Sequence, residues 1–210
     1  VSDAQRRGSV FVPMHWNRQF SSLTSVGGLI AAHTDPLSGQ PEFKFTPVRL
    51  RPFAAHWHGF LLSRRHLQLQ LSPADYWACA KGDGGWRYEF AGTAPVDDWR
   101  RQARELLCGA DAQVEWTEFL DQASGRYRAA RLVDDRLESC IFIGPDTALP
   151  PRDWLAEMFA ADRLASAQRA SLLSGRPPQG ETDRGRTVCA CFNVGYNTLL
   201  EAIRQQGLTS

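Results

Sequence analysis

The chain changes character at about residue 55, and this change limits the folds that it can adopt. Residues 14–46, a stretch of more than 30, show little hydrophobic periodicity and carry many turn-forming residues. So long an irregular segment is uncommon in a compact domain and is usually functional or disordered. Because aromatic and apolar side chains are scattered through it, we expect an ordered loop that wraps on other parts of the protein.

Short strands are expected on both sides of this loop. Residues 10–13 resemble a buried strand that ends at a proline. Residues 47–53 alternate apolar and basic side chains, which is typical of a half-buried strand. A strand, a loop and a strand are too few elements to close a sheet or barrel. We therefore expect residues 1–54 to depend on the rest of the chain for their order.

From residue 55 onward the patterns are regular and predict an α+β domain. Hydrophobic alternation indicates strands, and apolar spacing of three to four residues indicates helices. Short polar turns between alternating segments indicate hairpins. The expected strands are residues 56–62, 67–71 and 114–120, the hairpins are 76–81 with 86–90 and 128–133 with 137–143, and the helices are 96–107, 151–159 and 164–173.

The last part of the chain predicts a linker and a short cysteine-bearing unit. Residues 176–187 contain glycine, proline and charged residues with no apolar face, which is typical of a linker. A compact segment follows at 188–195, and an amphipathic helix through Leu199, Leu200 and Ile203 comes after it.

Composition excludes several classes of protein. With 43% apolar and 22% charged residues, the chain of 210 residues is close to a globular average. A net charge of +1 gives no general basic field for nucleic acid or anionic membranes, and no apolar run is long enough to span a bilayer. The five cysteines are odd in number, low in density and without a spacing typical of secreted proteins, which favours a reducing, cytoplasmic compartment. Because residue 1 is Val and the chain stops just after a helical pattern, we expect a part of a longer polypeptide.

Cys189 and Cys191 are the strongest candidates for metal ligands. Two thiolates at this spacing can hold one soft metal or one edge of an iron–sulfur cluster, although such sites usually need four ligands. The alternative is a pair of small core residues before a helix. His56 and His58 could form half of a zinc site on one strand face, but no third ligand is near in sequence, and we expect no metal there.

Candidate ligand-binding residues lie in and around the long loop. His15 and Trp16 could stack on and hydrogen-bond a planar heterocycle, or Trp16 could simply pack under the loop. Gly27 could allow close backbone approach to a ligand or mark a plain turn. Lys44, one of two lysines in the chain, could pair with a phosphate.

Several of these segments together resemble the molybdopterin oxidoreductases, and bacterial assimilatory nitrate reductase large subunits most closely. The resemblance rests on VFVPMHW at residues 10–16, DPLSGQPEFK at 35–44 and TPVRL at 46–50. VCACFNVG at 188–195, with its following helix, is similar to the start of the [2Fe–2S] domain related to bacterioferritin-associated ferredoxin. The middle of the chain, including RLESCIFIGP at 136–145, carries a weaker likeness.

This resemblance implies a division into four parts. Residues 1–54 would be the C-terminal segment of a molybdopterin dinucleotide-binding domain, which is part of a double-psi β-barrel. Residues 55–175 would be a small α+β connecting or docking domain, followed by the linker. Residues 188–210 would begin a helical [2Fe–2S] domain that is truncated here.

The resemblance also implies the cofactors and the residues that touch them. A molybdenum bis(molybdopterin guanine dinucleotide) would be contacted by Met14, His15 and Trp16 on the pterin side and by Lys44. At Gly27, where relatives carry an asparagine, a backbone contact would remain. Cys189 and Cys191 would be two of four [2Fe–2S] ligands, and a [4Fe–4S] cluster would lie in the missing N-terminal part.

The implied activity is reduction of nitrate to nitrite, with no catalytic residue in this part of the enzyme. The partners would be the rest of the same polypeptide and an electron donor such as ferredoxin, flavodoxin or an NADH-dependent reductase subunit. Neither nucleic acid nor membrane is expected as a partner. The alternative is a non-enzymatic module for electron transfer or interaction, which would not need the loop at residues 14–44.

Overall fold

The computed structural model describes most of the chain. The described residues are 6–12, 17–22, 26–42, 46–69, 73–82, 84–109, 114–180, 184–185, 187–189 and 194–207, with the backbone alone at Thr187 and Cys189. Four of the residues expected to touch the molybdenum cofactor (Met14, His15, Trp16 and Lys44) and the metal-ligand candidate Cys191 lie outside these ranges.

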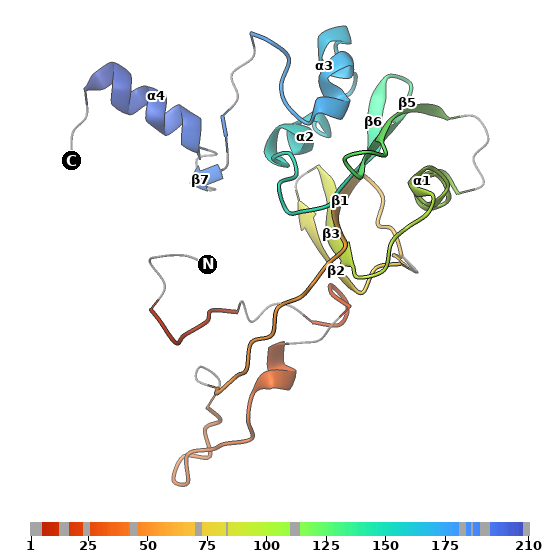
Figure 1. Ribbon diagram of the computed structural model, residues 1–210. Coiled ribbons are helices and arrows are strands. Elements are labelled where there is room, and N and C mark those ends of the chain that lie inside the picture. Colours follow the sequence, from red (N-terminus) through yellow and green to blue (C-terminus); the bar gives the residue numbers. More distant parts are fainter. Residues whose placement is uncertain are drawn as a thin grey trace.

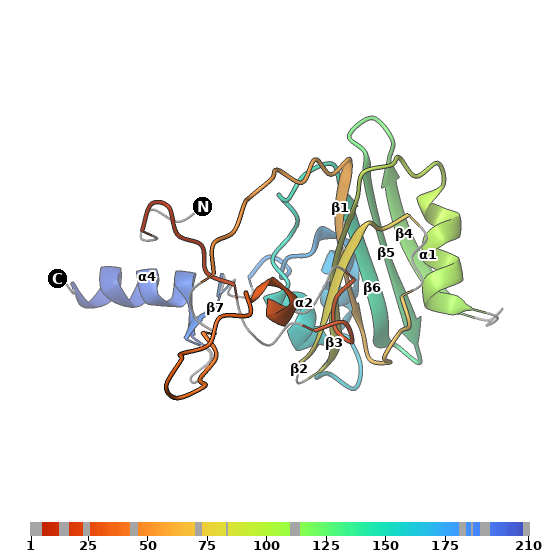
Figure 2. The same ribbon diagram turned by 90° about the horizontal axis from the view of Figure 1, so that it is seen from below.

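A six-stranded antiparallel sheet with helices on both faces forms the centre of the protein. The strand order is β2-β3-β1-β6-β5-β4. Figure 2 shows α1 on one face of the sheet and α2 on the other. The strands are β1 Trp57–Ser63, β2 Tyr76–Gly82, β3 Gly85–Gly92, β4 Glu115–Asp121, β5 Arg126–Val133 and β6 Arg136–Gly144, and the helices are α1 Trp99–Cys108, α2 Asp153–Met158, α3 Ser166–Ser171 and the short 3-10 helix η2 Leu172–Ser174.

Each face of the sheet has its own hydrophobic core. The central strands carry apolar side chains on both faces, because helices cover the sheet on both sides. The core under α1 includes Trp57, Leu61, Tyr88, Phe90, Ala103, Leu107, Tyr127, Ile141 and Ile143. The opposite core, under α2 and η2, includes Phe60, Leu62, Leu132, Cys140, Phe142, Trp154, Leu155, Phe159 and Leu172.

Both expected hairpins and the three helices expected at residues 96–107, 151–159 and 164–173 are confirmed, with shorter bounds for the last two. The β5–β6 hairpin closes through Asp134 and Asp135, with φ of 50° and 64°, which is the backbone of a type I′ turn. Helix α1 starts after Asp98, whose carboxylate accepts a hydrogen bond from the Arg101 backbone N–H at 3.0 Å, and it ends at Gly109 with φ of 56°. These are the start and stop signals that the sequence carries.

The strands predicted at residues 10–13 and 47–53 are wrong for the residues that the structure describes. Residues 10–12 and 47–53 are extended chain without strand pairing, and Phe11 and Leu50 are 79% and 71% exposed. A strand needs a partner along its hydrogen-bonding edge, and these segments run away from the sheet (Figure 1). The double-psi barrel expected here stays a prediction.

The strand predicted at residues 67–71 is also wrong over its described part, residues 67–69. The Tyr88 hydroxyl binds the Leu67 backbone, accepting from its N–H at 2.7 Å and donating to its carbonyl at 3.2 Å. A side chain thus satisfies the backbone that a neighbouring strand would otherwise pair. The alternation of leucines reflects packing of an irregular segment on the α1-side core, where Leu69 is buried.

One short stretch attaches the N-terminal segment to the sheet. The Cys79 N–H donates to the Phe20 carbonyl at 2.7 Å, and the Ser22 N–H donates to the Trp77 carbonyl at 2.9 Å. The Trp77 N–H donates in turn to the Ser22 hydroxyl at 2.9 Å. These contacts cover the free edge of β2 and join residues 20–22 to the domain that follows. The dependence of residues 1–54 on that domain stays a prediction.

We expect Asp134→Ala to lower the free energy of unfolding by about 1 kcal/mol, because alanine lacks the local hydrogen bonding that lets aspartate occupy positive φ. Asp134→Gly should recover most of that loss. Urea denaturation followed by circular dichroism measures both. Asp97→Ala, at an exposed aspartate without positive φ, is the control and should change stability by less than about 0.5 kcal/mol. Equal losses at both aspartates would contradict this explanation.

Candidate functional site

Gly27 is the one expected cofactor-contact residue that the structure describes. It lies in the short 3-10 helix η1 Val26–Leu29 and is exposed. Its carbonyl accepts a hydrogen bond from the Ile30 N–H at 3.3 Å. A Cβ built at Gly27 would meet no atom within 4 Å. Nothing in the described chain crowds this backbone, so it remains open to a ligand or to another part of the protein.

The DPLSGQPEFK motif forms a tight turn with paired arms. One carboxylate oxygen of Asp35 accepts hydrogen bonds from the Leu37 N–H at 3.0 Å, the Ser38 N–H at 2.7 Å and the Ser38 hydroxyl at 2.9 Å. These bonds, that from the Ser38 N–H first, lower the pKa of Asp35 below its ordinary value. Gly39, with φ of 67°, supplies the left-handed residue that closes the turn.

The arms of this turn lead directly toward Lys44. The Asp35 N–H donates to the Gln40 carbonyl at 2.8 Å, Thr34 and Pro41 form a β-bridge, and the Glu42 N–H donates to the His33 carbonyl at 3.0 Å. The turn projects away from the sheet (Figure 1), and Leu37 at its tip is 97% exposed. Residues 33–42, which we call the projecting hairpin, thus have a defined shape without support from the sheet.

His56 and His58 do not meet at one site. His56 lines a cavity with Asp97, Asp98 and Asp121 beside the start of α1, whereas His58 lines a different cavity with Tyr76 and Glu89. Among the described residues no group of three or more His, Cys, Asp or Glu side chains is placed to hold a metal ion. The two imidazoles therefore do not form the half-site that the HWH spacing suggested.

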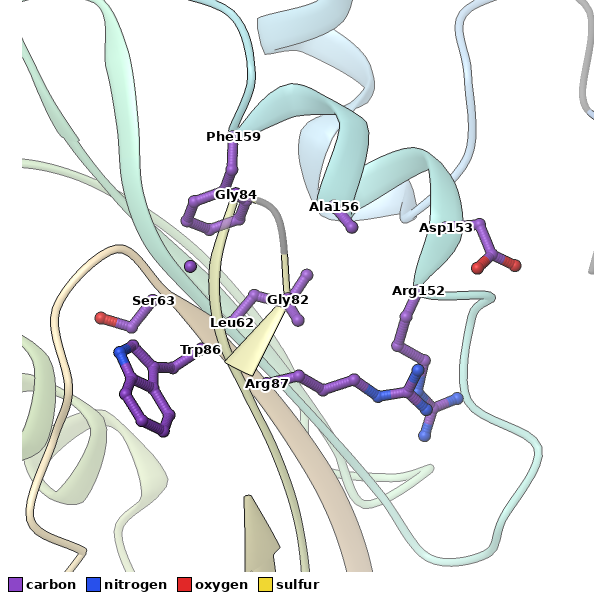
Figure 3. Close-up of a pocket in the computed structure, with 11 residues that line it drawn as sticks. Leu62, Ser63, Gly82, Gly84, Trp86, Arg87, Arg152, Asp153, Ala156 and Phe159 are labelled. Carbon is purple, nitrogen blue, oxygen red and sulfur yellow. The ribbon is translucent and has the colours of Figure 1, made fainter. Parts of the chain in front are cut away.

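A cavity of about 200 Å³ lies between the β2–β3 hairpin and α2, as Figure 3 shows. The hairpin comes close to α2 because it carries glycine: a Cβ at Gly84 would lie 2.8 Å from the Phe159 Cβ. The cavity is lined by Leu62, Ser63, Gly82, Gly84, Gly85, Trp86, Arg87, Arg152, Asp153, Ala156 and Phe159. The GDGG sequence predicts only a turn, and no local signal in the sequence indicates this cavity.

Two arginines at this cavity share one carboxylate. Arg152 donates to both Glu89 oxygens, from Nη2 at 2.7 Å and from Nε at 3.1 Å, and Arg87 Nε donates to Glu89 at 2.9 Å. The Arg152 guanidinium also lies 4.2 Å from the centre of the Phe60 ring. Burial and Glu89 raise the pKa of neighbouring Tyr76. Glu89 joins arginines from two separate parts of the chain, and no local sequence motif predicts this cluster.

The cysteine-bearing tail is attached to α2. The Arg184 Nη1 atom lies 3.4 Å from the Glu157 Oε1 atom of α2, and the Asn197 N–H donates to the Arg184 carbonyl at 3.0 Å. Strands β7 Thr187–Cys189 and β8 Val194–Gly195 pair, with Cys189 opposite Val194, and helix α4 Tyr196–Gln206 follows. On α4 the apolar side chains Leu199 and Ile203 are 38% and 44% exposed.

Comparison with known proteins agrees with the resemblance of the N-terminal segment. Residues 1–47 match the family described as the molydopterin dinucleotide binding domain. The chain is 35% identical over 212 residues to a nitrate reductase from Klebsiella oxytoca, an alignment that covers 97% of this chain and 22% of that protein. A nitrate reductase from Shewanella frigidimarina is 33% identical over 66 residues, 31% of this chain and 7% of that protein.

The chain therefore spans about a fifth of the length of the Klebsiella relative. No solved structure matches. The domain match and the two relatives thus show similarity to a molydopterin dinucleotide binding domain at residues 1–47 and to nitrate reductases over longer stretches.

For the cavity, we expect Gly84→Ala to destabilise the protein by about 1–3 kcal/mol, the usual cost of overpacking. The new methyl group would push the hairpin from Phe159 and from the Ala156 carbonyl, 3.3 Å from the built Cβ. Gly82→Ala is the matched control, since its nearest atom is 3.9 Å away. Thermal melting of both variants measures the difference. Equal melting temperatures would show that the hairpin does not need to approach α2.

Proposed function

We propose that the chain is the C-terminal part of an assimilatory nitrate reductase that uses molybdenum bis(molybdopterin guanine dinucleotide). The observation that carries this proposal is similarity to a nitrate reductase over 97% of the chain, together with the dinucleotide-binding family match at residues 1–47. The reaction would take nitrate, two electrons and two protons to nitrite and water. The molybdenum cofactor, when bound, would supply the oxygen-atom transfer, and the protein would supply binding, orientation and electrostatics.

The described residues fit a contact with such a cofactor. Gly27 offers unobstructed backbone, and the projecting hairpin holds its shape while leaving its surface open. In this proposal the segment 14–16, Gly27 and Lys44 hold one dinucleotide, with Lys44 pairing with a phosphate or pterin oxygen. No residue of this chain acts on nitrate, so none is a catalytic residue.

The tail is proposed as the start of a [2Fe–2S] domain through which electrons enter. Cys189 lies at the end of β7, and Cys191 lies in the chain between β7 and β8. Two thiolates are half of the usual ligand set, so the remaining ligands would come from the polypeptide beyond residue 210. A [4Fe–4S] cluster would belong to the part that precedes residue 1.

The α+β domain at residues 55–175 is proposed to dock a redox partner. Docking would also be the task of the second candidate function, a non-enzymatic interaction module. The cavity beside α2 favours such docking. Ligand pockets usually enclose about 300–1,000 Å³, and this one, at about 200 Å³, suits a single inserted side chain. Ferredoxin, flavodoxin or an NADH-dependent reductase subunit are the candidate donors.

A cytoplasmic location is part of the same proposal. In the portion of the chain that the structure covers, no helix combines the length and apolarity needed to cross a bilayer.

Lys44→Ala in the full-length enzyme should reduce molybdenum retention, because a charge-assisted hydrogen bond to the cofactor contributes about 1.5–3 kcal/mol. Lys44→Arg should restore retention only in part, since the guanidinium has a different donor geometry. Molybdenum per polypeptide after gel filtration is the measurement. Lys81→Ala, at the other lysine of the chain, is the control and should retain full molybdenum. Unchanged molybdenum content and nitrate reduction in Lys44→Ala would remove Lys44 from the cofactor site.

Changing Cys189 and Cys191 together to Ser in the full-length enzyme should abolish the [2Fe–2S] signal. Cys108→Ser, at a cysteine at the end of α1, should leave the signal intact. Anaerobic reconstitution followed by visible absorption and electron paramagnetic resonance measures it. A [2Fe–2S] signal that persists in the double variant would show that the ligands are elsewhere.

A further inference from the structure

We propose that the free edge of β4 is a docking site, to which a partner protein adds an extended segment as a further antiparallel strand with acidic side chains toward α1. Strand β4 is the last strand of the sheet and lies beside α1 (Figure 2). Among the described residues its one strand partner is β5. Docking at this edge does not depend on the proposed nitrate reduction, so the two can fail separately.

The hydrogen-bonding pattern of the sheet identifies the backbone groups at this edge. The Arg64 N–H donates to the Glu138 carbonyl at 3.0 Å, so these two residues form a hydrogen-bonded pair. Such pairs alternate with non-hydrogen-bonded pairs along an antiparallel ladder. Counting through the β1–β6, β6–β5 and β5–β4 registers leaves the N–H and C=O groups of three β4 residues facing outward, namely Trp116, Glu118 and Leu120.

The opposite edge of the sheet agrees with this count. The same alternation turns the backbone of Trp77 and Cys79 outward on β2. These are the residues whose backbone groups bond to Ser22 and Phe20. The chain thus covers the edge at β2, and no described segment does the same at β4.

A free edge strand is a template for pairing with another chain. Proteins often block such edges with lysine, proline or a bulge. The sequence of β4, EWTEFLD, contains neither residue, and its pairing with β5 has no register shift. In strand addition, main-chain hydrogen bonds supply affinity and alternate side chains supply specificity. The occupant that fits this edge is therefore an extended polypeptide segment.

The α1 side of the edge indicates an acidic occupant. One Glu118 oxygen lies 3.6 Å from Arg100 Nε and 4.0 Å from Arg104 Nη2, and these arginine side chains are 56% and 51% exposed. The other oxygen accepts hydrogen bonds from Trp116 Nε1 and from the Tyr127 hydroxyl, both at 2.9 Å. Two exposed guanidinium groups thus share one carboxylate that also serves two further donors. A carboxylate on an added strand would give them a second partner.

The other side of the edge indicates an apolar occupant. Side chains alternate along a strand, so Phe119 lies on the face opposite to Trp116 and Leu120. The Phe119 side chain is 47% exposed. It lines an open groove of about 580 Å³ at the end of β4, together with Arg100, Leu120, Asp121 and Gln122. A segment that alternates acidic and apolar residues would place carboxylates toward α1 and apolar side chains over Phe119.

A second copy of this chain fits the edge less well. Its own β4 would bring Glu118, but that carboxylate already has its own arginines and other donors. Symmetric pairing of two β4 strands with full overlap would also place Glu118 opposite Glu118, and Glu115 opposite Asp121. Like charges directly opposite each other are destabilising. The charges therefore favour a different partner.

Hydrogen exchange followed by NMR on the isotope-labelled chain of 210 residues tests the proposal. The probe is a capped peptide of the length of β4 that alternates valine and glutamate. Without peptide, the Trp116, Glu118 and Leu120 amides should exchange fast. With saturating peptide they should exchange about fivefold more slowly, the effect of one net hydrogen bond. The Thr117 and Phe119 amides, which pair with β5, are the internal controls and should stay slow throughout.

Modified peptides separate backbone pairing from side-chain contact. Lysine in place of glutamate should weaken binding. In an antiparallel pair, the peptide residues that bond to β4 are those whose side chains point toward α1, which are the glutamates. Methyl groups on the glutamate backbone nitrogens should therefore abolish binding, whereas methyl groups on the valine nitrogens should leave it intact.

Variants of the chain test the two sides of the edge. Arg100→Gln should weaken binding of the acidic peptide about two- to fivefold, as expected for an exposed ion pair. Arg101→Gln is the control, since Arg101 is 67% exposed and pairs with Glu105 instead. Phe119→Lys should block the edge. Phe53→Lys, at a phenylalanine that is 49% exposed and outside the sheet, should bind the peptide normally.

Four results would overturn the proposal. Unchanged exchange of the three outward amides with the acidic peptide would show that no strand adds there. Equal binding of the lysine peptide would show that the acidic assignment is wrong. Slow exchange of these amides without peptide, increasing with chain concentration, would assign the edge to a second copy. Slow exchange in the full-length enzyme without peptide would assign it to the remainder of that polypeptide.

Discussion

The pairing of β6 with β1 and β5 is the interaction on which the rest of the structure depends. Eight of the nine residues of β6 are buried, and only Arg136 at its start is exposed. A strand that is apolar on both faces needs cover on both sides of the sheet. Helix α1 supplies that cover on one face, and α2 with η2 supplies it on the other. On the α2 side the rings of Phe60 in β1 and Phe142 in β6 stack, with 4.8 Å between their centres.

This arrangement decides where the functional segments start. One edge of the sheet, at β2, receives the stretch at residues 20–22, and from there the N-terminal segment runs outward to the projecting hairpin. Glu157 of α2 forms an exposed ion pair with Arg184, which precedes the cysteine-bearing tail, and Arg152, the residue before α2, lines the cavity. The proposed cofactor segment and the proposed electron-entry segment are thus both attached to the domain between them, which supports a connecting role for residues 55–175.

The apolar surface of the N-terminal segment fits the same view. Phe11, Leu37 and Leu50 are between 71% and 97% exposed, although single exposed apolar residues are otherwise normal on proteins. The sequence around Phe11 and Leu50 predicts buried strands, but no described part of the chain packs over these side chains. The Klebsiella relative is more than four times as long as the part that aligns. Residues of that remainder are the natural cover in the proposed enzyme, and the double-psi barrel would form only with them.

The sequence alone determined most of the regular part of the fold and supplied the motifs on which the proposed function rests. Hydrophobic alternation, the GDGG turn, the Asp134–Asp135 turn and Gly109 are local signals, and local backbone preferences are enough to place these hairpins and this helix end. The family resemblance came from short motifs, and the comparisons with known proteins agree with its dinucleotide-binding and nitrate reductase parts. The positions of Met14, His15, Trp16, Lys44 and Cys191 remain predictions.

Only the tertiary structure decided which segments find partners. Residues 10–12 and 47–53 have strand-like sequences and no strand beside them, and Leu67 is bound by the Tyr88 hydroxyl instead of a neighbouring strand. Glu89 and Arg152 pair although they lie 63 positions apart in the sequence. A local sequence pattern cannot predict a contact at that separation. Hydrogen-bond partners and burial depend on what lies across from a segment in space, and one-dimensional periodicity carries only the segment's own preference.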